Sequence, residues 1–132
     1  MAHIEHLAIW TADLERLRVF YQRHFGARPG ARYSNPSKQF QSYFLSFDSG
    51  ARLELMSRPS VAAPPFATPA ATPSGYAHLA ISVGSRARVD ELTAQLRDAG
   101  VTILDGPRQT GDGYYESVVL DPDGNRIEIA AS

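Results

Sequence analysis

The sequence predicts an α+β fold built from two repeated halves. The strand-like segment His6-Leu7-Ala8-Ile9 recurs as His78-Leu79-Ala80-Ile81, and each copy is followed by a helical pattern that ends at a glycine. Each half also closes on a similar β-rich segment, Leu53-Glu54-Leu55 in the first and Ile127-Glu128-Ile129 in the second. Self-similarity of this kind indicates two copies of one supersecondary unit.

The first half, about residues 1–57, is predicted to run strand, helix and then three strands. Residues 3–10 have strand composition, and Thr11 or Asp13 can cap the helix behind them. Apolar residues at helical spacing predict a buried stripe, which Gly26 ends: Leu14, Leu17, Tyr21 and Phe25. We expect a short strand near 27–33 and then a hairpin of strands 42–47 and 51–56, turned at residues 48–50.

The second half, about residues 76–132, repeats this plan. Residues 76–83 form the strand, Ser85 caps the helix, and Gly100 ends it. The predicted buried stripe is Val89, Leu92, Leu96 and Ala99. A short strand near 101–104 precedes a hairpin of 116–120 and 126–130. We align residues 41–45 with 116–120, which gives the second turn one residue fewer.

The segment between the halves, about residues 58–75, contains five prolines and predicts an extended, semi-rigid linker. The 132 residues suffice for one compact domain with a core but not for two independent ones, so residues 1–132 are expected to form a single domain.

Composition excludes several classes of function. Thirteen Lys and Arg stand against fourteen Asp and Glu without a basic stripe, so nucleic acid is not expected as a partner. The absence of Cys excludes disulfides and thiolate metal sites. The chain has no run of about 18 apolar residues and no signal peptide, so we expect a cytoplasmic protein without membrane contact.

Side-chain alternation places four residues off the predicted core. In each first strand the His opposes the Leu and Ile side chains, and in each closing strand the Glu does the same. If each sheet curves with its helix on the convex side, the two halves would form a cup around these residues: His6, Glu54, His78 and Glu128. Nitrogen and oxygen donors without thiolate suit one divalent ion, Ni²⁺, Zn²⁺, Co²⁺, Mn²⁺ or Fe²⁺.

These repeated strands, together with residues 121–128, resemble the vicinal oxygen chelate superfamily, which includes glyoxalase I, bleomycin-resistance proteins and extradiol dioxygenases. The resemblance covers nearly the whole chain and implies paired βαβββ modules, commonly in a homodimer with metal sites between modules. His6, Glu54, His78 and Glu128 match the bacterial glyoxalase I pattern position by position. Fosfomycin-modifying relatives and methylmalonyl-CoA epimerases keep a different residue at Glu54.

The chain departs from glutathione-dependent glyoxalases at two positions. Those enzymes resemble each other in an Arg four residues after the first His and an Asn four residues after the first Glu. Trp10 and Arg58 stand there in this chain, which weakens the case for glutathione and favours another small oxygenated substrate. Trp10, Arg58, Tyr114 and Tyr115 are our candidate substrate-binding residues, the two tyrosines in a Gly-rich loop at 111–115.

The predicted chemistry is that of a metal-dependent lyase or isomerase. The substrate would chelate the ion through neighbouring oxygens, and the ion would act as a Lewis acid while a carboxylate removes a proton. Either Glu54 or Glu128 can serve as that base, and we favour Glu128. Two alternatives remain open: a metal-free protein that sequesters an antibiotic or toxin, and an Fe²⁺-dependent dioxygenase-like enzyme, which needs an open two-His, one-carboxylate triad.

Overall fold

A computed structural model describes residues 1–62, 72 and 74–132. The chain divides into two compact units, Met1–Pro64 and Pro65–Ser132. The middle of the predicted linker, residues 63–71 and 73, lies outside the described residues. Among the helices that the structure describes, none is both long and apolar enough to span a membrane.

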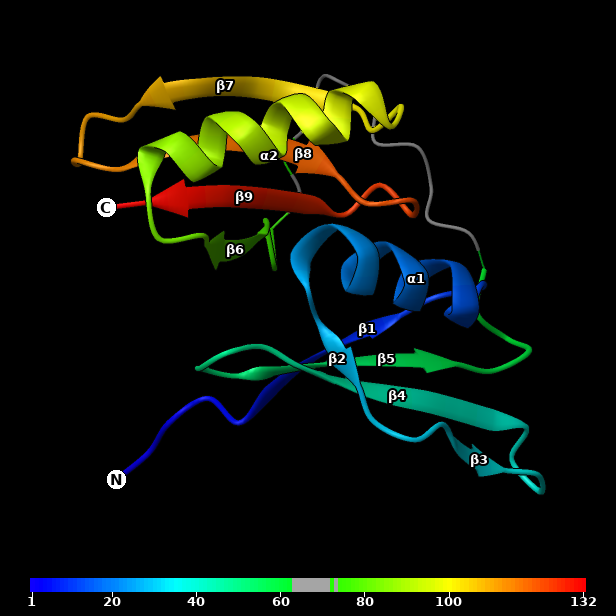
Figure 1. The fold of residues 1–132 in the computed structure, drawn as a ribbon. Helices are drawn as coiled ribbons and strands as arrows, with labels where there is room; N and C mark the ends of the chain where they lie inside the picture. The colour runs from blue at the N-terminus through cyan, green and yellow to red at the C-terminus, as the bar shows by residue number, and fades with distance from the viewer. Residues whose placement is uncertain (63–71, 73) are drawn as a thin grey trace. The chain divides into compact units, whose positions relative to one another are not determined.

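Unit 1 is a sheet with one covering helix, as Figure 1 shows. Its elements are β1 (His6–Trp10), α1 (Leu14–Phe25), β2 (Arg28–Pro29), β3 (Tyr33–Asn35), β4 (Phe40–Ser46) and β5 (Arg52–Ser57). The strand order is β1-β5-β4-β2, with β3 also paired to β4. β1 runs parallel to β5, and the other pairs are antiparallel. The single short strand predicted near residues 27–33 is therefore two strands, β2 and β3.

Capping residues define the ends of α1, and its buried side chains pack against the sheet. The Asp13 side chain accepts a hydrogen bond from the Arg16 backbone N–H, so Asp13 is the N-cap. Thr11 is buried instead, and its hydroxyl accepts a hydrogen bond from the Asp13 N–H. Gly26 ends the helix at a φ of 66°, which glycine adopts without strain. The buried side chains are Leu14, Leu17, Phe20 and Tyr21 on α1, and Leu45, Leu53 and Leu55 on the sheet.

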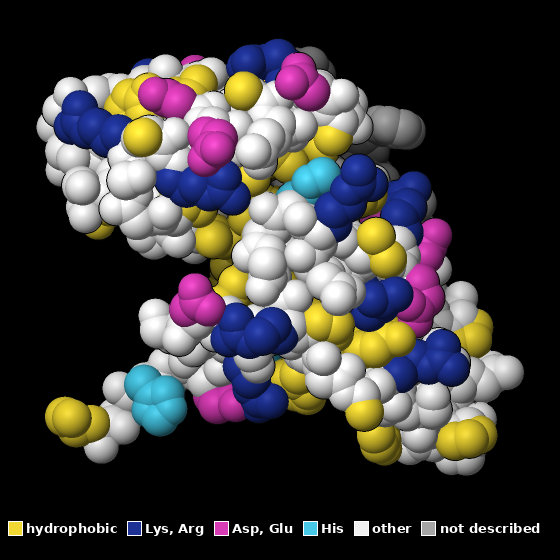
Figure 2. Space-filling model, viewed as in Figure 1, with side chains coloured by type: hydrophobic (Ala, Val, Ile, Leu, Met, Phe, Trp, Pro, Cys, Tyr) yellow, Lys and Arg dark blue, Asp and Glu magenta, His cyan; other side chains and the backbone are white. Residues whose placement is uncertain are grey.

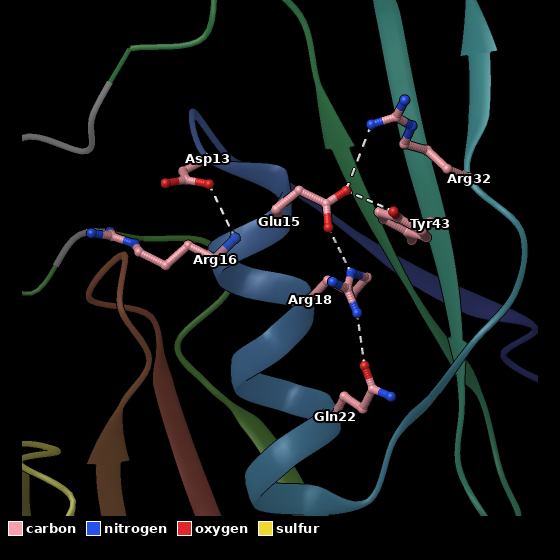
Figure 3. A network of polar contacts seen from close by, with 7 residues as sticks. All are labelled: Asp13, Glu15, Arg16, Arg18, Gln22, Arg32 and Tyr43. Carbon is pink, nitrogen blue, oxygen red and sulfur yellow. Dashed lines mark hydrogen bonds and ion pairs between the residues drawn. The ribbon is translucent and has the colours of Figure 1, made fainter.

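A polar network ties α1 to β4, and Figure 3 shows it with the Asp13 cap. One Glu15 carboxylate oxygen accepts from the Tyr43 hydroxyl at 2.6 Å, and the other accepts from Arg18 at 2.8 Å. Arg32 lies 3.7 Å from the same carboxylate. These partners lower the pKa of Glu15, the Tyr43 hydroxyl most strongly. Hydrogen bonding to the Glu15 carboxylate raises the pKa of Tyr43.

Unit 2 repeats the plan with four strands (Figure 1). Its elements are β6 (Leu79–Ser82), α2 (Arg86–Asp98), β7 (Ile103–Gln109), β8 (Tyr115–Leu120) and β9 (Arg126–Ala131). The order is β6-β9-β8-β7, and β6 runs parallel to β9. The two units confirm the predicted α+β fold of two repeated modules: unit 2 has the expected βαβββ order, and unit 1 has one further short strand.

The helix of unit 2 departs from its predicted buried stripe at one end. Ser85 is the N-cap, as expected, and accepts a hydrogen bond from the Arg88 N–H at 3.2 Å. Ala99 is the exposed C-cap, so its assignment to the core is wrong. Thr93 is buried, and its hydroxyl donates to the Val89 carbonyl, which lets a polar side chain enter the core.

Strand β7 is longer than the strand predicted at 101–104, and its pairing with β8 is irregular around Gly106. Gly106 has a φ of +78°, and a Cβ there would lie 2.6 Å from the Glu116 backbone oxygen. Only glycine fits a backbone approach this close. The irregularity therefore depends on Gly106 and lies beside Glu116.

Candidate metal centre

Each unit brings one His and one Glu together through the same strand register. Ala8 of β1 lies opposite Glu54 of β5, and Ala80 of β6 lies opposite Glu128 of β9. The His stands two residues before the Ala in both units, and residues two apart share a face of the sheet. His6 Nε2 lies 3.7 Å from Glu54 Oε1. In unit 2, His78 Nε2 lies 3.1 Å from Glu128 Oε2.

The chemistry of these pairs fits a divalent metal ion. An imidazole nitrogen and a carboxylate oxygen are common ligands for such ions. The histidine side chains are 39% and 41% exposed, and the carboxylates of Glu54 and Glu128 are 14% and 22% exposed. Within the described parts of the chain, no group of three or more His, Cys, Asp or Glu side chains could hold a metal. Each pair therefore offers two candidate ligands.

In unit 1 a closed set of contacts holds the His6 ring. The Glu5 carboxylate pairs with His6 Nδ1 and also with the Arg52 guanidinium. Arg52 lies 4.1 Å from the Phe44 ring centroid, and Phe44 packs edge-on against His6 at 5.2 Å. The hydrogen bonds from His6 and Arg52 lower the pKa of Glu5. A proton on Nδ1, donated to Glu5, leaves the Nε2 lone pair directed toward Glu54.

Unit 2 lacks this arrangement and has a second carboxylate instead. Ala77 stands where Glu5 stands in unit 1, directly before the histidine. Glu116 shares the face of Glu128, because Val118 lies opposite Glu128 and Glu116 is two residues away. The pKa of Glu116 is raised, first by burial and then by the charge of Glu128 and a hydrogen bond to it. The two pairs thus have different neighbours.

The strand register also corrects our alignment of the two hairpins. Phe44 lies opposite Glu54 and Val118 lies opposite Glu128, so both hairpins place their Glu ten residues after its partner. Glu116 consequently corresponds to Ser42, not to Gln41, and the second turn is not one residue shorter. The predicted site did not include Glu116.

Two of the predicted substrate residues lie together in unit 1. The Arg58 guanidinium lies 4.4 Å from the Trp10 ring centroid, and both side chains line one cavity. Trp10 lies on the His6 face of β1, since residues two and four apart share a face. Arg58 directly follows β5, the strand of Glu54.

The two predicted tyrosines lie elsewhere. The Tyr115 hydroxyl donates to Asp90 of α2, so Tyr115 lies on the helix side of the sheet and not on the face of Glu128. Its role in substrate binding stays a prediction. Tyr114 is 47% exposed in a turn that Thr110 closes by hydrogen bonds in both directions with the Tyr114 backbone, at 2.8 and 3.0 Å. Residues 110–114 thus form a hydrogen-bonded hairpin turn between β7 and β8.

Comparison with known proteins decides the family. The family model of the Glyoxalase/Bleomycin resistance protein/Dioxygenase superfamily matches residues 3–129. The chain belongs to this superfamily. A comparison with curated proteins finds no significant match.

Solved structures of this superfamily resemble the chain over nearly its whole length. The trypanothione-dependent glyoxalase I of Leishmania major is 28% identical, with a TM-score of 0.76 over 98% of this chain and 86% of that one. A superfamily domain from Frankia sp. EAN1pec is 17% identical, with a TM-score of 0.82 over 100% and 98%. Glyoxalase I of Zea mays is 22% identical, with a TM-score of 0.80 over 98% of this chain and 44% of the maize chain. The last two likenesses show the fold.

Proposed function

We propose that this protein is a metal-dependent lyase or isomerase of the glyoxalase type, acting on a small substrate that chelates the ion through neighbouring oxygens. The observation that carries this proposal is the pair of His and Glu side chains that both units build in the same register. Membership of the superfamily and the 28% identity to the Leishmania major glyoxalase I support it.

The proposed ligands of one divalent ion are His6, Glu54, His78 and Glu128. Nickel, zinc, cobalt, manganese and iron(II) all accept such donors. A bound divalent ion would supply Lewis acidity, which would make a proton on the carbon beside the chelating oxygens of the substrate easier to remove. Glu5 and Arg52 hold the His6 ring in place, which favours binding with Nε2 as the donor atom.

Glu128 is the better candidate for the base that takes this proton. Its neighbour Glu116 places a second carboxyl group on the same face, within hydrogen-bonding reach. Glu54 instead lies opposite Phe44, and Ser42 stands where Glu116 stands in unit 2. A carboxylate with a neighbouring proton acceptor can pass the proton onward and return it to a second position of the substrate.

Metal analysis and turnover together test this function. The protein is purified without added metal, its metal content is measured, and isomerase turnover is assayed with hemithioacetals of methylglyoxal made from several thiols, glutathione among them. Glu54→Gln and Glu128→Gln are compared with Glu91→Gln, an exposed carboxylate paired with Arg88 on α2. We expect both site variants to lose metal or turnover and the control to keep both.

A second candidate function is sequestration of a small molecule without chemistry. The aromatic cavity that Trp10 and Arg58 line favours it, because a ligand can bind there whether or not a metal is present. Full metal content without turnover on any thiol adduct would reject the glyoxalase activity but keep the metal site. Metal-free protein that still binds a ligand would support sequestration.

A further inference from the structure

The face of the unit 1 sheet that carries His6 and Glu54 also carries a cavity that the proposed metal chemistry does not use. Its volume is about 560 Å³. The lining residues are Trp10, Tyr33, Asn35, Lys38, Phe40 and Arg58. In Figure 2, hydrophobic and Lys or Arg side chains gather around the end of unit 1 where β3 meets β4. All six lining residues belong to this unit, so the cavity is complete within it.

Three touching aromatic rings form the walls of the cavity. Trp10 packs edge-on against Phe40 with ring centroids 6.2 Å apart, and Tyr33 packs against Phe40 at 6.0 Å. Trp10 and Tyr33 nevertheless remain 43% and 55% exposed. A cluster of large aromatic side chains in contact with solvent is characteristic of a binding surface, since burying the rings under a ligand is favourable. The walls suit a flat apolar group.

Two cations lie at the same cavity. The Arg58 guanidinium stacks on Trp10, and Lys38 lines the cavity beside Tyr33 and Phe40. In the described ranges of the chain, neither side chain forms an ion pair with a carboxylate. Stacking on an aromatic ring fixes the guanidinium plane and leaves its N–H groups available to a planar anion. Charge complementarity thus favours a carboxylate.

The cavity is also within reach of the His6 and Glu54 pair. Trp10 pairs with Met56, two residues after Glu54, and stands four residues after His6 on the same face. At roughly 3.3 Å per residue, these separations correspond to about 7 Å from Glu54 and about 13 Å from His6 along the strands. One small molecule can span this distance.

We propose that the cavity binds the ring and the carboxylate of a small aromatic acid, with Trp10, Tyr33 and Phe40 around the ring and Arg58 and Lys38 on the carboxylate. As a statement about the substrate, this rests on the proposed function; binding in the cavity does not, because all of its contacts lie away from His6 and Glu54. The volume suits one substituted ring. Glutathione has carboxylates but no ring, so it does not satisfy the aromatic walls.

Trp10 is the only tryptophan of the chain, so its fluorescence reports on the cavity directly. The whole protein is titrated with phenylacetate, with phenylacetamide, which keeps the ring without the charge, and with hexanoate, which keeps the charge without the ring. We expect phenylacetate to bind about fivefold or more tightly than either analogue, because only phenylacetate combines ring burial with a charge-assisted contact. Glutathione is expected to leave the fluorescence unchanged.

Substitutions test whether Arg58 binds the carboxylate of phenylacetate. Arg58→Gln should weaken phenylacetate about fivefold or more and leave phenylacetamide unchanged. Arg97→Gln, which removes an exposed positive charge on α2, is the matched control and should change neither. Calorimetry repeats each titration, because Arg58 stacks on the fluorophore and its substitution alters the signal. The His6→Gln variant should bind phenylacetate with unchanged affinity. Binding in the cavity is thereby tested independently of the proposed metal site.

Equal affinity for all three probes, or phenylacetate binding that Arg58→Gln leaves intact, would overturn the proposal. A Trp10 emission that shifts with protein concentration but not with added phenylacetate would also overturn the proposal. That result would indicate that a second copy of the chain covers the cavity.

Discussion

His78 Nε2 lies 3.1 Å from Glu128 Oε2, although His78 precedes the first strand of its unit and Glu128 lies in the last. Parallel pairing of β6 with β9 brings them together, and parallel pairing of β1 with β5 does the same for His6 and Glu54. An imidazole nitrogen and a carboxylate oxygen at this distance can bind one divalent metal ion together. The residues that surround the two His and Glu pairs, and other contacts within each unit, lead to the predictions below.

Glu5→Gln should weaken metal binding without unfolding the protein. Glu5 accepts from His6 Nδ1 and holds the ring with Nε2 toward Glu54, so its loss should lower metal affinity about tenfold, as for other partners of metal-binding histidines. Competition with a chromophoric chelator measures the affinity. Asp48→Asn, at a fully exposed carboxylate paired with Arg28, is the control. Equal affinities for the two variants would rule out the positioning role of Glu5.

Gly106→Ala should destabilise unit 2 by roughly 1–3 kcal/mol, the range of a strained backbone residue. The substitution combines a positive φ with a Cβ only 2.6 Å from the Glu116 oxygen. Gly84→Ala is a matched control, because Gly84 has a φ of +90° and nothing within 4 Å of its Cβ position. Chemical denaturation of both variants separates the effect of the close approach from that of φ. If the two variants lose the same stability, the close approach costs nothing.

Sequence periodicity predicted the elements well because the core residues repeat at helical and strand spacing. Leu17, Tyr21, Leu92 and Leu96 are fully or nearly fully buried, as the stripes required. Strand alternation also placed His6 and Glu54 on the same side, since alternation depends only on the pleat of a strand. The repeat therefore carried most of the information about the candidate site.

The errors in the prediction concern the pairing register of the strands and the lengths of the turns. Neither is a property of a single strand. Glu116 was missed because the predicted site used only residues that repeat in both halves, and Ser42 stands at the equivalent position of unit 1. The correct alignment of the two hairpins follows from their equal spacing. Glu54 lies ten residues after its partner Phe44, and Glu128 lies ten residues after its partner Val118. The predicted loop included Tyr115, whereas Tyr115 begins β8 and shares a face with the buried Ser117. Glu5 carried no periodic signal, because it precedes β1.

Thr93 and Ser117 should show strong coupling in unfolding experiments. Their hydroxyl groups lie 2.7 Å apart, both in the core of unit 2. Thr93→Val leaves the Ser117 hydroxyl unpaired and should cost about 1–3 kcal/mol, the penalty for an unsatisfied buried group. The double variant Thr93→Val with Ser117→Ala should cost less than the sum of the single variants. Strictly additive losses would mean that the two hydroxyl groups do not stabilise each other.

The Glu15 and Tyr43 pair should make stability depend on pH. The pKa of Glu15 is lowered below 4.5 in the folded protein, so its contribution is complete above about pH 4.5 and is lost as the pH falls through the folded value. A double-variant cycle of Glu15→Gln and Tyr43→Phe should give a coupling of about 0.5–1 kcal/mol at pH 7 that declines toward pH 3. Because the Tyr43 pKa is raised, its own contribution should persist up to pH 10 and fall above it. A coupling that is constant from pH 3 to 7 would exclude the carboxylate as its source.

We propose that His6 and His78 bind one shared divalent ion. The metal content of single histidine variants shows whether both units contribute ligands to it. His6→Gln and His78→Gln are purified beside the unaltered protein without added metal, and bound divalent ions are measured by mass spectrometry. We expect the unaltered protein to hold a divalent ion and each substitution to lower the metal content about tenfold or more, in line with the loss of a direct ligand. Metal-free unaltered protein, or full metal content after either substitution, would contradict it.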